Sequence, residues 1–326
     1  MSMSRRQSFR VLAGAAAGSV VGLPALAETY PARPVRIVVP FAPGGPNDLA
    51  GRLIAQKLSD QLGRQFLVDN VGGAGGNIGA GQAAKALPDG YTILLASPSY
   101  AINPLLYGEV PYSPRDSFDA VTMAVTAPTL LTVHPSVPAR TVKDLVAHIK
   151  ATPGKLSYAS PGVGTPPHLL GELFRLSLDL DLVHVPFNSG GQAIASTVGG
   201  HTPISFGALP PAVSLVKDGK LRALALTSAT STNALPGTPT IAQAGYPEIA
   251  ADIWSALLVP KGTPKDIIRL LQQETTKALA NSDVQNRLNG LGYQPVGNTP
   301  EECTAQIAAD LTKWEKVIRA AGIRAG

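Results

Sequence analysis

The chain has 326 residues, of which 44% are hydrophobic and 15% charged, and its formal net charge is +5. No apolar stretch reaches the roughly 20 residues that a membrane-spanning helix needs, and no cluster of Lys and Arg alternates with aromatic residues. These features argue against an integral membrane protein and against a nucleic-acid-binding protein. The length is sufficient for two hydrophobic cores, so we predict a soluble protein with two domains.

The first 27 residues have the three parts of a cleavable export signal. Three arginines precede a weakly apolar run over residues 11–23, and the small-residue triplet 25–27 predicts cleavage after Ala27. Residues 4–9 resemble a degenerate twin-arginine pattern, so the general secretory and the twin-arginine routes both stay open. Three of the 27 basic residues and none of the 22 acidic ones lie in this segment, which leaves the rest of the chain nearly neutral.

Past the export signal, short runs of Val, Ile and Leu alternate with longer helical stretches. This alternation is typical of βαβ units and a mostly parallel sheet, so we predict the α/β class. In the first half of the chain it predicts strands over 36–40, 65–69 and 91–96, with helices over 48–62 and 77–87 between them.

A second α/β lobe is predicted after residues 126–133. Thr141 is placed to cap its first helix. The predicted helices are 142–150, 168–176 and 190–198, and the predicted strands are 156–159, 183–185, 204–206 and 221–227.

The remainder of the chain is predicted to return to the first lobe. It has an extended apolar segment over 253–260 and helices over 265–280, 283–290, 300–307 and onward to 318. The predicted division is therefore 28–126 for the first part of lobe 1, 127–250 for lobe 2 and 251–326 for the second part of lobe 1.

Four turns rich in Gly, Pro, Ser or Asn lie between a predicted strand and a predicted helix: 40–48, 70–81, 160–168 and 186–191. Glycine lets the backbone approach a ligand, while free amides and the positive end of a helix dipole favour an anion. Two such turns in each lobe are expected to converge on one cleft. The alternative is that Asn47 or Asp48 only caps its helix and that the glycines only serve the turns.

Motifs for catalysis, cofactors and metals are missing. The sequence has no GxSxG, HExxH or P-loop motif, and residues 70–81 lack the dinucleotide spacing at the turn. The single cysteine, Cys303, is expected to be a half-buried apolar residue. We therefore predict no cofactor and no metal. The alternative hypothesis, from another functional class, is an exported hydrolase or isomerase that uses Asp48 and His168 as acid and base.

Several stretches, in this order, resemble the Bug family, the extracytoplasmic solute receptors of tripartite tricarboxylate transporters. The resemblance implies a type II periplasmic binding fold with two interlobe crossovers, and a monomer that closes on a small carboxylate. It also implies membrane permease subunits as partners, with a ligand sensor for a signalling protein as the alternative. The stretches are YPARPVRIVVPFAPGGPND, NVGGAGGNIGA, LPDGYTILLAS, YASPGVGTPPHLLGELF, HVPFNSGG, GKLRALALTSA, LPGTPTIAQAGYPEI, WSALLVPKGTP and the helix around Trp314.

The resemblance also implies which residues bind the ligand. The sequence departs from the family pattern at Phe187, where Tyr is common, and at Asn47, where Thr or Ser is frequent. Gly207 and Ala208 stand where a polar pair is usual, so a more apolar or aromatic acid is conceivable. The implied binding residues are Phe41, Gly45, Asn47, Asp48, Asn77, Ser97, Ser160, Gly164, Thr165, His168, Phe187 and Asn188.

Overall fold

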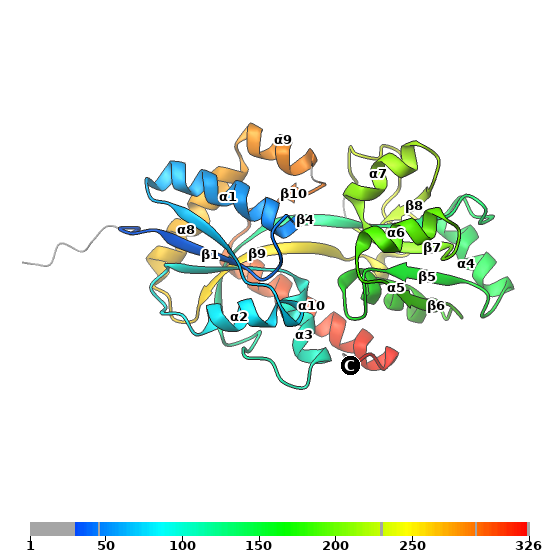
Figure 1. Ribbon diagram of the computed structural model, residues 1–326, viewed down its shortest axis with the longest axis horizontal. Helices are drawn as coiled ribbons and strands as arrows, with labels where there is room; N and C mark the ends of the chain where they lie inside the picture. The colour runs from blue at the N-terminus through cyan, green and yellow to red at the C-terminus, as the bar shows by residue number, and fades with distance from the viewer. Residues whose placement is uncertain (1–29, 45, 229–230, 291, 325–326) are drawn as a thin grey trace, which may run out of the picture.

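The computed structural model describes residues 30–324 apart from positions 45, 229–230 and 291. It has two α/β lobes side by side, with extended strands running between them (Figure 1). The export signal and Gly45 lie outside the described residues. Within the described part of the chain, no helix is both long and apolar enough to cross a membrane.

The first lobe is built on parallel strands whose two faces are covered by helices. Ile37 and Val39 pack in one core with Ile54 of α1, whereas Val38 faces the opposite core with Ala80 of α2. Because both faces are buried, the strand is apolar at nearly every position. The elements are β1 (Val35–Val39), α1 (Pro46–Leu62), β2 (Phe66–Asn70), the short 3₁₀ turn η1 (Ala74–Gly76), α2 (Asn77–Ala84), β3 (Thr92–Ala96) and α3 (Pro98–Leu106).

The second lobe has a smaller sheet in which β5 pairs in parallel with both β6 and β7. Its first helix begins as predicted, because the Thr141 hydroxyl accepts a bond from the Asp144 amide at 3.1 Å and the Asp144 carboxylate accepts one from the Thr141 amide at 3.0 Å. The elements are α4 (Val142–Ala151), β5 (Ser157–Ser160), α5 (Pro166–Ser177), β6 (Val183–Pro186), α6 (Gly190–Val198), β7 (Ile204–Ala208), α7 (Leu209–Lys217), β8 (Arg222–Leu226) and η2 (Pro247–Ile249).

Two long strands join the lobes. β4 (Phe118–Val133) pairs antiparallel with β9 (Asp252–Pro260) over 118–128, and its last five residues pair with β7. Eight of the described strands therefore form one path in the order β2-β1-β3-β9-β4-β7-β5-β6, while β8 and the short β10 (Gln294–Pro295) pair with β4 off this path. The sequence pattern did not predict the first half of β4. It also did not predict α3, which has Pro104 inside it, or α7, which has prolines in its first turn.

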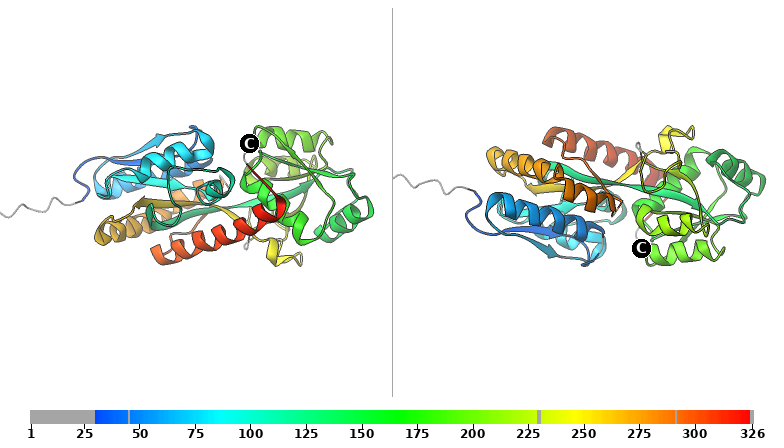
Figure 2. Two further views of the ribbon diagram at one scale, coloured as in Figure 1. Left: turned by 90° about the horizontal axis from the view of Figure 1, so that it is seen from below. Right: turned by 90° about the horizontal axis from the view of Figure 1, so that it is seen from above.

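The chain ends on a helix that contacts both lobes. We predicted separate helices over 300–307 and onward to 318, but α10 (Pro300–Ala321) is continuous and roughly 33 Å long. Before it come α8 (Lys265–Leu279), α9 (Ser282–Gly290) and β10 (Gln294–Pro295). Figure 2 shows α10 running along one side of the molecule from the first lobe to the second.

The packing of α10 differs between its two halves. Cys303 and Ile307 are buried in a core of the first lobe, whereas Trp314 and Ile318 are buried in the core of the second lobe, where α10 packs against α5. We expected the closing helices to complete the first lobe, and this expectation does not hold for the second half of α10. A helix of this length extends beyond one lobe.

We expect Trp314→Ala to lower the free energy of unfolding by about 3–5 kcal/mol, because it empties a large buried volume between α10 and the second lobe. Urea unfolding of the purified protein measures this change. Lys316→Ala, at an exposed position of the same helix, is the control and should change stability by less than about 0.5 kcal/mol. Equal stabilities of the two variants would contradict the interlobe role of α10.

Candidate functional site

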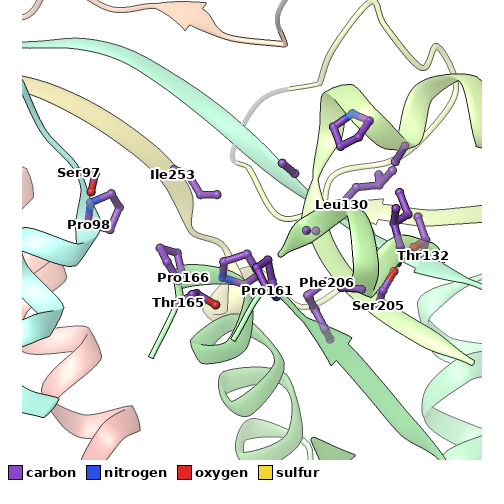
Figure 3. Close-up of a pocket in the computed structure, with 18 of the residues that line it drawn as sticks. Ser97, Pro98, Leu130, Thr132, Pro161, Thr165, Pro166, Ser205, Phe206 and Ile253 are labelled. Atoms are coloured by element: carbon purple, nitrogen blue, oxygen red, sulfur yellow. Dashed lines mark hydrogen bonds between the residues drawn. The ribbon is translucent and has the colours of Figure 1, made fainter. Parts of the chain in front are cut away.

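A cavity of about 340 Å³ lies between the two lobes (Figure 3). We call it the interlobe cleft. It takes residues from the starts of α1 and α3, from the two crossing strands, and from α5, α6, β7 and α7. They are Phe41, Asn47, Ser97, Pro98, Ser99, Leu130, Thr132, Pro161, Thr165, Pro166, Pro167, Gly190, Ala193, Ile194, Ser205, Phe206, Gly207, Ala208, Pro211, Ala212 and Ile253.

None of the described residues that line the cleft is Asp, Glu, Lys, Arg or His. An anion bound here would therefore be held by amides, hydroxyls and helix N-termini instead of by a cationic side chain. Such neutral donors suit a carboxylate, since a carboxylate oxygen accepts several hydrogen bonds.

The first-lobe wall contains a serine whose hydroxyl is free to bind a ligand. Ser97 is the N-cap of α3 and is 5% exposed, yet its hydroxyl forms no hydrogen bond with any residue that the structure describes. Pro98 follows at the first helical position and has no N–H, so the Ser99 amide is the first donor of the helix. The positive end of α3 and the Ser97 hydroxyl together favour an anion at this point.

Asn47 adds a second donor on the same wall. Its side-chain Oδ1 accepts hydrogen bonds from the Ser255 hydroxyl at 3.1 Å and from the Tyr293 hydroxyl at 3.5 Å. No described residue accepts a bond from Asn47 Nδ2, so this nitrogen can donate to a ligand. Phe41, two residues after β1, supplies an aromatic surface beside it.

Asp48 holds the first turn together and does not line the cleft. Its carboxylate accepts bonds from the Gly44 amide at 2.9 Å, from Arg52 Nε at 3.0 Å and from Asn70 Nδ2 at 2.9 Å. Burial raises the pKa of Asp48, but these bonds and the Arg52 charge outweigh it, so the pKa is below its ordinary value. Asp48 is thus an ionised, internally paired group that orders the loop after β1.

Asn77 plays a similar part in the glycine-rich loop. It is 5% exposed, and its Oδ1 accepts bonds from Asn103 Nδ2 at 2.8 Å and from the Tyr112 hydroxyl at 3.1 Å. At Gly79 a Cβ would lie 2.6 Å from the Val71 carbonyl oxygen, so glycine allows α2 to pack closely on the preceding chain. Asn77 is tied into this packing and does not line the cleft.

In the second lobe, one of the four predicted residues of the loop after β5 lines the cleft. This residue is Thr165, whose hydroxyl donates to the Gly162 carbonyl at 2.7 Å. Ser160, Gly164 and His168 are buried behind it. The Gly164 amide donates to His168 Nδ1 at 3.0 Å, so the imidazole supports the loop from inside.

His168 is buried and pairs with His184, which is half-buried. Its ring stacks on His184 with centroids 3.9 Å apart, and His184 Nε2 lies 2.7 Å from the Ser160 hydroxyl oxygen. Burial lowers the pKa of both rings to about 4, against the opposing charge of Glu172. Both histidines are therefore neutral at neutral pH, and the neutral form of His168 accepts the bond from the loop.

The last two predicted residues lie farther from the cleft lining. Phe187 is half-buried and its amide donates to the Ser160 carbonyl at 3.0 Å, while Asn188 is exposed. The cleft therefore brings together Phe41, Asn47, Ser97 and Thr165 of the predicted set. The sequence indicated part of its apolar side at Gly207 and Ala208, which line the cleft, but not Leu130, Phe206 and Ala212. The strand–Pro–Pro pattern at 204–211 is a signal for a helix start beside a strand end.

Comparison with known proteins decides the family. The model of the tripartite tricarboxylate transporter family receptor matches residues 50–323. The chain belongs to this family. Protein BugT of Bordetella pertussis is 35% identical over 99% of both chains, which confirms the Bug-family resemblance.

Solved structures of similar proteins agree with this assignment. The R. palustris protein solved with adipate is 33% identical, with a TM-score of 0.77 over 90% of this chain and 99% of that chain. MatC from Rhodopseudomonas palustris with bound malate is 29% identical, with a TM-score of 0.73 over 89% and 100% of the two chains. The predicted α/β fold of two lobes around a cleft is thereby confirmed.

The histidine pair gives the receptor a predictable pH dependence. In the unfolded chain a histidine takes up a proton below about pH 6.5, but folded His184 stays neutral down to about pH 4, so stability is lost as the pH falls through this window. We expect the wild type to lose about 2 kcal/mol relative to His184→Gln between about pH 7 and about pH 5 in urea unfolding. A stability difference between the two proteins that is the same at both pH values would contradict the buried neutral state.

Proposed function

We propose that this receptor binds a small carboxylate in the interlobe cleft and closes its lobes around it. The observation that carries the proposal is the Ser97 hydroxyl, which is buried, unpaired among the described residues and placed at the N-terminus of α3. Because this hydroxyl lines the cleft and has no partner among the described residues, it can donate a hydrogen bond to a ligand oxygen.

The two relatives solved with ligands support the carboxylate class, since adipate and malate are both carboxylates. In this chain the Ser97 hydroxyl, the Ser99 amide and the Asn47 side-chain amide offer three neutral donors on one wall. Hydrogen bonds to a charged group contribute about 1.5–3 kcal/mol each, so three of them can replace much of the water around a carboxylate.

Lobe closure would bend the two crossing strands, which are joined to each other where they enter the second lobe. The Thr227 amide donates to the Thr129 carbonyl at 2.8 Å, and the Ala251 amide donates to the Thr227 carbonyl at 2.8 Å. Thr227 thus links both crossings where they enter the second lobe. A ligand that contacts both walls binds the closed state more tightly than the open one and shifts the population toward closure.

The setting we propose is outside the cytoplasm. Export and cleavage after Ala27, by the general secretory or the twin-arginine route, would release a receptor that delivers its ligand to the permease subunits of a tripartite tricarboxylate-type transporter. The family to which the chain belongs supports this role.

We propose that the receptor returns its ligand unchanged. The acid–base pair considered from the sequence does not face the cleft. Asp48 is ionised and occupied by Arg52 and Asn70, and His168 is buried with its Nδ1 accepting the Gly164 amide. A proton transfer from either residue to a ligand in the cleft would first require these bonds to break.

Calorimetric titration of the mature protein with mono- and dicarboxylates tests the proposal, and we expect one site per chain. Ser97→Ala should weaken binding by about 10- to 100-fold, because a hydrogen bond to the carboxylate is lost, and should leave stability nearly unchanged. The control is Ser157→Ala, at a half-buried serine outside the cleft lining. Binding that is equally strong in both variants would remove Ser97 from the site, and failure of every carboxylate to bind would refute the function.

Export is tested separately by expressing the full chain in a Gram-negative host and measuring the mass of the extracytoplasmic product. We expect a mature N-terminus at Glu28, since the triplet before it is a small-residue cleavage motif. Replacing Arg5 and Arg6 by Lys distinguishes the routes, because a twin-arginine route should fail and the general secretory route should not. A full-length product that stays in the cytoplasm would contradict export.

A further inference from the structure

The two ends of the interlobe cleft differ in polarity. In Figure 3, Ser97 and Pro98 lie at one side, whereas Leu130 and Phe206 lie at the other. The donors described above belong to the first-lobe side. On the second-lobe side the lining consists mainly of aliphatic, aromatic and small side chains, among them Leu130, Ile194, Phe206, Ala208 and Ala212.

The hydroxyl groups on the second-lobe side are bonded to the protein itself. Thr132 Oγ1 and Ser205 Oγ lie 2.7 Å apart and bond to each other, so only one hydroxyl hydrogen of the pair remains to be donated. The Thr165 hydroxyl donates to the Gly162 carbonyl. A second carboxylate at this side would therefore meet few free hydroxyl donors.

Backbone amides are also depleted there. α5 begins with Pro166 and Pro167, and α7 has Pro210 and Pro211 at its second and third positions. Proline has no N–H, so these two helix N-termini present fewer donors than an ordinary helix start. The third helix start, α6 at Gly190, has no proline and also lines the cleft, but it is exposed to water.

We propose that the ligand is an amphipathic monocarboxylate, whose carboxylate lies at the first-lobe wall and whose aliphatic or aromatic tail fills the second-lobe side. The inference rests on the proposed carboxylate function and specifies its ligand class. A second carboxylate would lose its water at the apolar side without gaining an equivalent set of donors or a cation. An apolar tail would instead bury its surface against Leu130 and Phe206.

The decisive comparison is between hexanoate and adipate, which have the same six-carbon chain and differ by one terminal carboxylate. Calorimetry on the mature protein should give a Kd for hexanoate at least tenfold lower than for adipate, with phenylacetate also bound. Adipate binding as tightly as hexanoate would overturn the inference and leave the carboxylate function standing. If hexanoate, phenylacetate and adipate all fail to bind, the inference fails, and the proposed function fails with it only when no other mono- or dicarboxylate binds.

Gly207→Arg tests the placement of the tail. Gly207 lines the cleft, it lies in β7, and a Cβ built there meets no atom within 4 Å, so a side chain can enter the cleft without a clash at its base. We expect the guanidinium to pair with the distal carboxylate of adipate and to shift the hexanoate-to-adipate preference at least tenfold toward adipate.

Gly207→Met is the matched control, since it adds bulk without charge and should not favour adipate. An arginine variant with a wild-type circular dichroism spectrum and an unchanged preference would overturn the placement. If the arginine variant does not fold, the wild-type comparison of hexanoate with adipate decides the inference alone.

Discussion

The antiparallel pairing of β4 with β9 is the contact on which the two-lobed shape depends. Because both strands continue from one lobe into the other, they set how far apart the lobes lie and where the cleft opens between them. The start of β9 is also tied to α10, since Trp254 Nε1 donates to Asp310 at 2.6 Å and Lys313 Nζ donates to the Ala250 carbonyl at 2.8 Å. Strand pair and helix thus form a three-part connection, and any closure must bend it.

Most polar residues near the cleft stabilise loops, and few are left for a ligand. Asp48 accepts a hydrogen bond from Arg52, and Asn77 accepts bonds from Asn103 and Tyr112. His168 accepts a bond from the Gly164 amide. Such internal bonds fix the backbone before a ligand arrives, which lowers the conformational entropy that binding has to overcome. A neutral cleft then recognises an anion through a small number of fixed donors instead of through a mobile charged side chain.

Local patterns predicted much of the fold correctly. The apolar runs over 36–40 and 91–96 form strands, and the cap at Thr141 starts α4, because these features depend on neighbours in sequence. The pattern failed at α3, where Pro104 lies inside the helix, and at the first half of β4. Tertiary packing stabilises both: α3 against α10, and β4 against β9.

The sequence by itself determined the class of elements, the turns after the strands and, through its motifs, the receptor family. It also identified Phe41, Asn47, Ser97 and Thr165, which do line the cleft. Only the tertiary structure decided which side chains have free donors, because the Ser160 hydroxyl bonds to His184 and the His168 ring stacks on it, although His184 comes from another segment. Most of the apolar side of the cleft was decided in the same way, since Leu130, Ile194, Phe206 and Ala212 come from different strands and helices and no local pattern records their proximity.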